Sequence, residues 1–133
     1  MSSFDPPRQR PAPDVISGLT LRGEKEARKL EGLTLIVAIK QTCDGCRDFV
    51  FSDLVELSDT PVVIVSATGD LNAEWVDALQ PILVAPDVLK ALEIRWPPFY
   101  VLVDPQERRV VTEGVVFAPS QVASEIAPYL TTT

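Results

Sequence analysis

The chain has 133 residues, of which 46% are apolar, and it carries a formal net charge of −7 with no histidine. This length suits one domain that buries about two-thirds of the surface its unfolded chain would expose. The lack of histidine excludes Ser-His-Asp and Cys-His catalysis and histidine metal sites, and the negative charge disfavours a nucleic-acid partner.

The N-terminal segment is rich in proline, with four of the twelve prolines in the first 13 residues. We therefore expect residues 1–14 to form a flexible proline-rich arm and residues 15–133 to form the single domain. No run of 18 apolar residues predicts a membrane span. Residues 1–7 lack the apolar stretch of a secretory signal, so the cytoplasm is the expected location and a membrane partner is not expected.

The pattern along the domain predicts alternating helices and strands. Acidic and basic residues interleave over 24–31, which is typical of a solvated helix, and Gly32 follows as a stop signal. The nearly continuous apolar run from Leu33 to Ile39 predicts a strand covered on both faces. Residues 44–57 change to helical spacing, and residues 61–67 predict a second buried strand.

The second half of the domain predicts the remaining elements. They are a weak helix over 72–79, a helix over 87–94, strands over 99–103 and 109–117, and a final helix opened by Pro119 and Ser120. The turn chemistry of residues 104–108 indicates an antiparallel hairpin, whereas strands separated by helices pair in parallel. We expect an α/β fold with a mixed sheet of about four to five strands and helices on both faces.

The two cysteines, Cys43 and Cys46, stand where the first predicted strand gives way to a helix. Backbone N–H groups at a helix start favour an anion, and a thiolate is the nucleophile of disulfide exchange. A spacing of three residues lets the second sulfur attack the first. The pattern predicts Cys43 as nucleophile and Cys46 as resolving thiol, a reaction that requires no metal or organic cofactor.

Three other interpretations of this pair stay open. A structural disulfide closing so short a loop constrains the unfolded chain by only about 2 kcal/mol, against roughly 4.7 kcal/mol for a 100-residue loop. A zinc site needs four ligands, which this chain reaches only by sharing thiolates across a dimer. Alternatively, the cysteines are small core residues, which suits Cys46 on the apolar face of its helix better than Cys43.

The order of these segments resembles the thioredoxin-like superfamily, nearest the TlpA-type thiol-disulfide reductases. The likeness rests on the strand Leu33–Ile39, the Cys43-x-x-Cys46 motif opening a helix, and the segment Trp96-Pro97-Pro98 that leads into an apolar strand ending at Asp104. It covers about residues 33–130. The resemblance implies that Pro98 is a cis-proline facing the cysteines and that Trp96, Pro97 and Pro98 bind substrate.

The chain also departs from the family pattern. The buried carboxylate that the family places six residues before the first cysteine falls at Val37, and its partner lysine falls near Ser66. Asp44 puts a carboxylate beside the nucleophile, which opposes the thiolate. Pro97 has no N–H with which to pair with an extended substrate. Trp96, Pro97, Phe49 and Phe99 are candidates for an apolar lip, although core packing suits the two phenylalanines slightly better.

The sequence thus predicts a thiol-disulfide oxidoreductase. Its expected partner is a disulfide-containing protein or a low-molecular-weight thiol, and the pattern does not predict an oligomeric state. The alternative is a redox-inactive interaction module of the same fold, which the missing carboxylate and Pro97 favour. A metal site shared across a dimer is a third interpretation.

Overall fold

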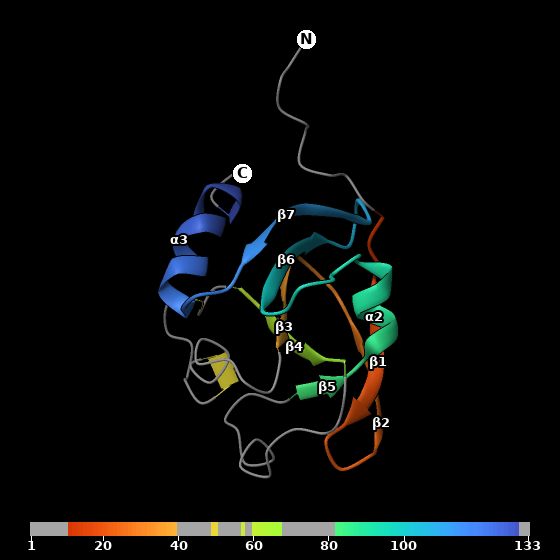
Figure 1. Ribbon diagram of the computed structural model, residues 1–133. Coiled ribbons are helices and arrows are strands. Elements are labelled where there is room, and N and C mark those ends of the chain that lie inside the picture. Colours follow the sequence, from red (N-terminus) through yellow and green to blue (C-terminus); the bar gives the residue numbers. More distant parts are fainter. Residues whose placement is uncertain (1–10, 40–48, 51–56, 58–59, 68–81, 131–133) are drawn as a thin grey trace.

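The computed structural model describes residues 11–39, 49–50, 57, 60–67 and 82–130 (Figure 1). These residues form one mixed seven-stranded sheet in the order β2-β1-β5-β4-β3-β6-β7, with two helices. The elements are β1 (Val15–Thr20), β2 (Lys25–Lys29), β3 (Thr34–Ile39), β4 (Val62–Ser66), β5 (Ile82–Val84), α2 (Pro86–Ala91), β6 (Phe99–Asp104), β7 (Arg109–Val115) and α3 (Pro119–Leu130).

The centre of the sheet is the strand that the sequence predicts most clearly. All six residues of β3 are buried, as a continuous apolar run requires of a strand covered on both faces. β3 pairs in parallel with β4 and antiparallel with β6, so the predicted strands and their mixed pairing are confirmed. Ile39 lies opposite Ser66, and Ala38 lies opposite Phe99, so the carboxyl end of β3 adjoins the start of β6.

The predicted helix over 24–31 is wrong, because this segment forms the outer strand of a hairpin. β2 pairs antiparallel with β1, and the turn is closed by the Thr20 hydroxyl, which accepts hydrogen bonds from the N–H groups of Arg22 and Glu24. Gly23 supplies the positive φ of +84° that the turn needs. The residues favour a helix in isolation, but pairing with β1 outweighs that preference, and their charges suit a sheet edge.

The helix predicted over 87–94 is confirmed as the shorter α2. The N–H of Ile94 donates to the carbonyl of Leu89 (2.9 Å), and the N–H of Glu93 donates to that of Lys90 (3.1 Å), which is a Schellman motif. Glu93 takes the left-handed conformation of that motif, with φ +56°. The short strand β5 precedes α2, and the weak helix expected over 72–79 lies outside the described residues.

The hairpin expected around residues 104–108 is confirmed as β6 and β7, and α3 begins at Pro119 as predicted. The carboxylate of Asp104 accepts hydrogen bonds from the N–H groups of Gln106 and Glu107 and so orders the turn. The register of the hairpin shifts between Leu102 and Val103.

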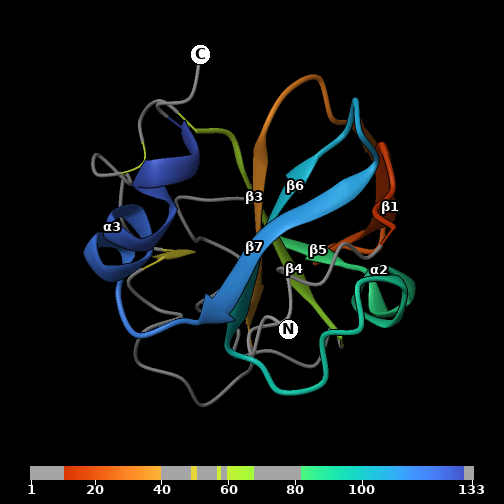
Figure 2. The ribbon, with the colours of Figure 1, turned by 90° about the horizontal axis from the view of Figure 1, so that it is seen from above.

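The side chains of the sheet form two cores, one on each face. Val88, Leu89 and Leu92, in and just after α2, pack on one face, whereas Val122 and Ile126 of α3 pack on the other. Figure 2 shows the two helices on opposite sides of the sheet. The prediction of four to five strands is wrong, because the sequence did not reveal β1, β2 and β5. Within the described residues α2 covers one face, and α3 together with the helical residues Phe49 and Val50 covers the other.

The end of the predicted arm contacts the domain. Pro11 forms a bridge with Arg109, and the N–H of Ala12 donates to the carbonyl of Arg108 (2.9 Å). Asp14 forms an ion pair with Arg108 at 3.4 Å. These contacts join the segment before β1 to the start of β7, which is the last strand at the opposite end of the sheet from β2 and β1. Neither described helix has the length and apolar character needed to cross a membrane.

Candidate functional site

The two cysteines lie outside the described residues, and the structure describes the chain on either side of them. Ile39, the last residue of β3, is four positions before Cys43 and is buried. Phe49, three positions after Cys46, is helical and fully buried in the core that α3 covers. The core placement favoured for Phe49 is therefore confirmed, and Phe49 is not part of an exposed lip. The roles predicted for Cys43 and Cys46 stay predictions.

The segment containing Pro98 is held between two strand ends. The Pro97–Pro98 peptide bond is cis, as the resemblance implies. Phe99 follows at once and pairs with Ala38 near the end of β3. On the other side, the N–H of Val116 donates to the carbonyl of Pro98 (3.2 Å) just beyond the end of β7. The segment is thus attached to both neighbours of β6.

Two large aromatic side chains near Pro98 are turned to solvent. Trp96 is 81% exposed and Phe117 is 71% exposed. Trp96 precedes Pro98 by two positions, and Phe117 directly follows Val116, whose N–H donates to the carbonyl of Pro98. The sequence pointed to Trp96 but missed Phe117, because an aromatic residue at the end of a strand looks like part of the core. Phe99, by contrast, is half-buried against the core beneath α2.

Two hollows adjoin this segment. The larger, about 420 Å³, lies beside Pro97 and α2, with Leu89 and Ile94 as apolar lining and Lys90, Glu93 and Arg95 as charged lining. The smaller, about 240 Å³, is lined by Trp96 and Phe99 together with Glu93 and Arg95. The predicted substrate-binding residues Trp96 and Pro97 thus each line a hollow, and Arg95 contributes to both. Their role in binding stays a prediction.

The place where the family has a buried carboxylate is apolar in this chain. Val37 is fully buried between Ile64 of β4 and Tyr100 of β6, its partners in register. Ser66, where the family has a lysine, is also buried. Side chains at positions 37 and 66 therefore supply no ionisable group that could take a proton from a resolving thiol.

A hydrogen-bond network joins the end of β7 to α3. The side-chain amide of Gln121 accepts from the N–H groups of Phe117 (2.8 Å) and Ala118 (3.2 Å), and it donates to the carbonyl of Val115 (2.9 Å) and to Glu125 (2.9 Å). The buried Tyr100 hydroxyl donates to the other oxygen of Glu125 at 2.7 Å. Gln121 thereby fixes the stretch that carries Phe117 and contacts Pro98.

These contacts shift two pKa values in opposite directions. The hydrogen bonds from Gln121 and Tyr100 lower the pKa of Glu125, because both stabilise its carboxylate. Burial, followed by the hydrogen bond to Glu125, raises the pKa of Tyr100, because both favour the neutral phenol. Tyr100 is therefore a hydrogen-bond donor at neutral pH.

Metal ligation finds no support within the described ranges. No group of three or more acidic or cysteine side chains comes together there in a way that could hold a metal ion. Both cysteines lie outside those ranges, so the metal site shared across a dimer stays a hypothesis.

Comparison with solved structures shows the fold of this chain. A thiol:disulfide interchange protein from Chlorobium tepidum superposes with a TM-score of 0.63 at 16% identity, covering 92% of this chain and 97% of the other. A thio-disulfide isomerase from Thermus thermophilus gives a TM-score of 0.62 at 20% identity, covering 96% of both chains. Yeast Sco1, solved with copper bound, gives 0.62 at 13% identity, covering 94% and 96%.

These similarities establish a thioredoxin-like fold, as the resemblance in the sequence implied. No protein-family model matches the chain, and no curated protein matches it in sequence. At such low identities the comparison shows the fold alone.

Proposed function

We propose that this chain is a thiol-disulfide oxidoreductase in which Cys43 attacks and Cys46 resolves. The observation that carries the proposal is the register of β3 and β6, in which Ala38 lies opposite Phe99. Cys43 follows Ile39 by four residues, so the chain can carry it at most about 14 Å from the end of β3. Pro98 precedes Phe99, so the motif and the predicted substrate-binding segment leave the sheet at the same edge.

The proposed reaction balances within the two disulfides. The Cys43 thiolate attacks one sulfur of a partner disulfide, and the other partner sulfur leaves as a thiolate that takes up a proton. The Cys46 thiolate then attacks the Cys43 sulfur of the mixed disulfide and expels the second partner thiolate. The partner gains two electrons and two protons, and Cys43–Cys46 becomes a disulfide. The reverse sequence oxidises a partner dithiol.

The described residues support substrate recognition on this edge of the sheet. Trp96 is largely exposed beside Pro97 and Pro98, and Phe117 is exposed on the adjoining strand end. Arg95 adds a cation, and Glu93 a carboxylate, to both hollows of the segment. The proposed substrate is therefore a disulfide within an extended polypeptide, or a small disulfide whose carboxylate meets Arg95. The TlpA-type reductases remain the nearest branch by the sequence resemblance.

Redox titration of the full chain, followed by mass spectrometry, tests this proposal. A reversible mass change of two protons at a potential between about −120 and −270 mV would support exchange. In addition, Cys46→Ser should accumulate a mixed disulfide through Cys43, whereas Cys43→Ser should not. Absence of trapping through either cysteine would overturn the proposal.

The second candidate function is an interaction module that no longer turns over. The observation in its favour is the complete burial of Val37, where the family has a proton-accepting carboxylate. Val37→Glu would restore that group, although it buries a charge. A large gain in exchange rate in Val37→Glu, together with negligible activity of the natural chain, would favour the module.

A further inference from the structure

The strand β1 has one side that is only partly paired. The N–H of Leu30 donates to the carbonyl of Asp14 (2.8 Å), and the N–H of Thr20 donates to that of Glu24 (2.8 Å). Antiparallel ladders alternate, so the even-numbered residues of β1 direct their peptide groups toward β2. The odd-numbered residues direct theirs to the other side, where Leu19 pairs with Val84 of β5.

Toward the N-terminus of β1, pairing with β5 ends at Leu19. The same register would place Ser17, two residues before Leu19, opposite residue 86, which is a proline without an N–H and begins α2. The N–H of Ala85 donates instead to the carbonyl of Ser66 (2.9 Å). The N–H and C=O of Ser17 therefore have no ladder partner among the described residues. Such an unpaired edge is able to accept an added strand.

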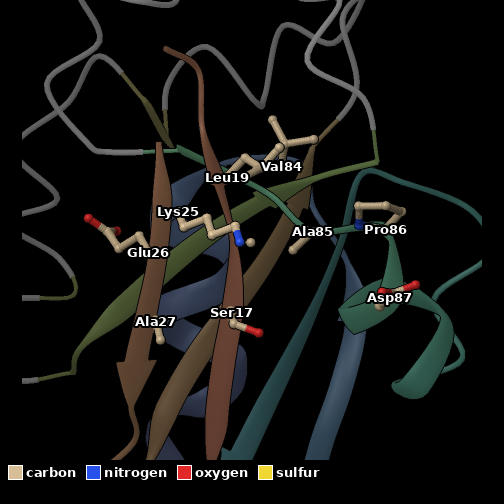
Figure 3. Close-up of a pocket in the computed structure, with 10 residues that line it drawn as sticks. Ser17, Leu19, Lys25, Glu26, Ala27, Val84, Ala85, Pro86 and Asp87 are labelled. Atoms are coloured by element: carbon tan, nitrogen blue, oxygen red, sulfur yellow. The ribbon is translucent and has the colours of Figure 1, made fainter. Parts of the chain in front are cut away.

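The unpaired edge lines a groove of about 690 Å³ between the β1–β2 hairpin and the start of α2 (Figure 3). Most of its lining is apolar and comes from Leu19, Val84, Ala85 and Pro86. Gly18 allows β1 to lie close to the end of β5, because a Cβ at Gly18 would be 2.5 Å from the carbonyl oxygen of Val84.

The charge that faces the groove is positive. Lys25, Glu26 and Asp87 all line it, but Figure 3 shows Lys25 extending toward β1 while the carboxylates of Glu26 and Asp87 point away. Lys25 forms no ion pair with the part of the chain that the structure describes. Glu26 is engaged by an ion pair with Arg28 at 3.0 Å, so the ammonium group of Lys25 favours an anionic group on the occupant.

We infer that this groove binds an extended acidic segment of a partner polypeptide, which adds a strand to the open edge of β1. The peptide backbone pairs with the N–H and C=O of Ser17, and a carboxylate of the segment meets the ammonium group of Lys25. Apolar side chains that alternate with the carboxylate along the peptide contact Leu19 and Val84. This binding involves no cysteine, so it goes beyond the proposed exchange reaction.

The probe for this docking site is an acetylated, amidated hexapeptide that alternates threonine and valine around one central aspartate. It is titrated by NMR into the full chain carrying Cys43→Ser and Cys46→Ser, which excludes covalent capture. The amide signal of Ser17 should shift and gain protection from hydrogen exchange. The same peptide with N-methylated backbone amides should bind at least tenfold more weakly. An unchanged Ser17 signal at millimolar peptide, or equal binding of the methylated peptide, would overturn the inference.

Charge reversal gives the second arm of the test. Lys25→Glu should weaken binding of the aspartate peptide about two- to fivefold and strengthen binding of a lysine counterpart. Lys29→Glu is the matched control, because it changes the net charge equally on the same strand but lies outside the groove lining. Equal effects of the two variants would contradict a specific contact at Lys25. Exchange activity of the natural chain is measured separately, so failure of one proposal is distinguishable from failure of the other.

Discussion

The ring of Tyr100 lies across Gly114, its partner on the neighbouring strand, so closely that a Cβ added to Gly114 would be 2.8 Å from the ring carbon Cε2. The same Cβ would be 3.0 Å from the phenolic oxygen, which donates to Glu125. A single glycine in an edge strand thus gives Tyr100 the room to reach from β6 to α3.

Gly114→Ala should therefore destabilise the protein. The added methyl group forces the buried ring to move and strains its hydrogen bond to Glu125, and overpacking of this kind costs about 1–3 kcal/mol. Urea unfolding measures the change in the free energy of unfolding. Gly32→Ala is the control, because a Cβ there meets nothing within 4 Å, and it should change stability by no more than about 0.5 kcal/mol. Equal effects of the two substitutions would contradict this account of Tyr100.

Glu125→Gln should alter how stability depends on pH. The pKa of Glu125 is lowered in the folded protein, so its carboxylate stabilises the fold above the ordinary glutamate pKa of about 4.3, and this contribution is lost as the pH falls through the lowered value. The difference in unfolding free energy between the natural chain and Glu125→Gln should therefore be constant above about pH 6 and shrink in acid.

The cause of that pH dependence is checked by a double-mutant cycle. Gln121 provides the largest contribution to the lowered pKa of Glu125, so the acid-dependent difference should become smaller in a Gln121→Ala background. An undiminished difference in that background would show that Gln121 is not responsible.

The parts of the fold that the sequence predicted are those in which local pattern and tertiary environment agree. The run Leu33–Ile39 is apolar except for Thr34 because both faces of β3 are covered, so its burial can be predicted from the local sequence pattern. The segment Lys25–Lys29 is the opposite case, since its residues favour a helix and only pairing with β1 makes it a strand. β5 is missed because three residues carry too little periodicity.

Some features of the candidate site were also predicted from the sequence, and others were not. The cis bond before Pro98 agrees with what the family resemblance implied, and the burial of Phe49 agrees with its helical spacing in the sequence. The exposure of Phe117 depends on how β7 meets α3, which no local pattern encodes. The hydrogen bonds of Gln121 reach only residues 115–125 and fit a glutamine at the third position of a helix, a local signal that the sequence interpretation did not use.

Glu93→Gly should be more stable than Glu93→Ala, which removes the same side chain. Glu93 adopts φ +56° after α2, a conformation that costs a residue with a Cβ about 1 kcal/mol more than glycine. Thermal and urea unfolding should show a difference of about 0.5–1 kcal/mol between the two variants. Glu107→Gly makes the same exchange in a turn where positive φ is confined to the neighbouring Arg108, so it should reduce stability through the added freedom of the unfolded chain. A Glu93→Gly variant that is no more stable than Glu93→Ala would contradict the conformational argument.

Pro97→Thr should increase the affinity for an extended disulfide-containing peptide. The thioredoxin-like resemblance implies that the residue before Pro98 pairs with substrate through its backbone, and proline has no N–H to donate. Restoring the donor adds one hydrogen bond, worth about 0.5–1.5 kcal/mol, which corresponds to a Kd about two- to tenfold lower. The affinity is measured with Cys43→Ser and Cys46→Ser present in both proteins, so that binding is separated from exchange.

Pro97→Ala identifies the atom responsible. Alanine also restores the N–H but has no hydroxyl, so both variants should gain affinity to a similar degree if the backbone donor is the cause. A gain confined to Pro97→Thr would assign the effect to the threonine side chain. No gain in either variant would mean that position 97 does not pair with the peptide, and the hollow beside Pro97, with Lys90 and Arg95, would then become the surface to probe for substrate contacts.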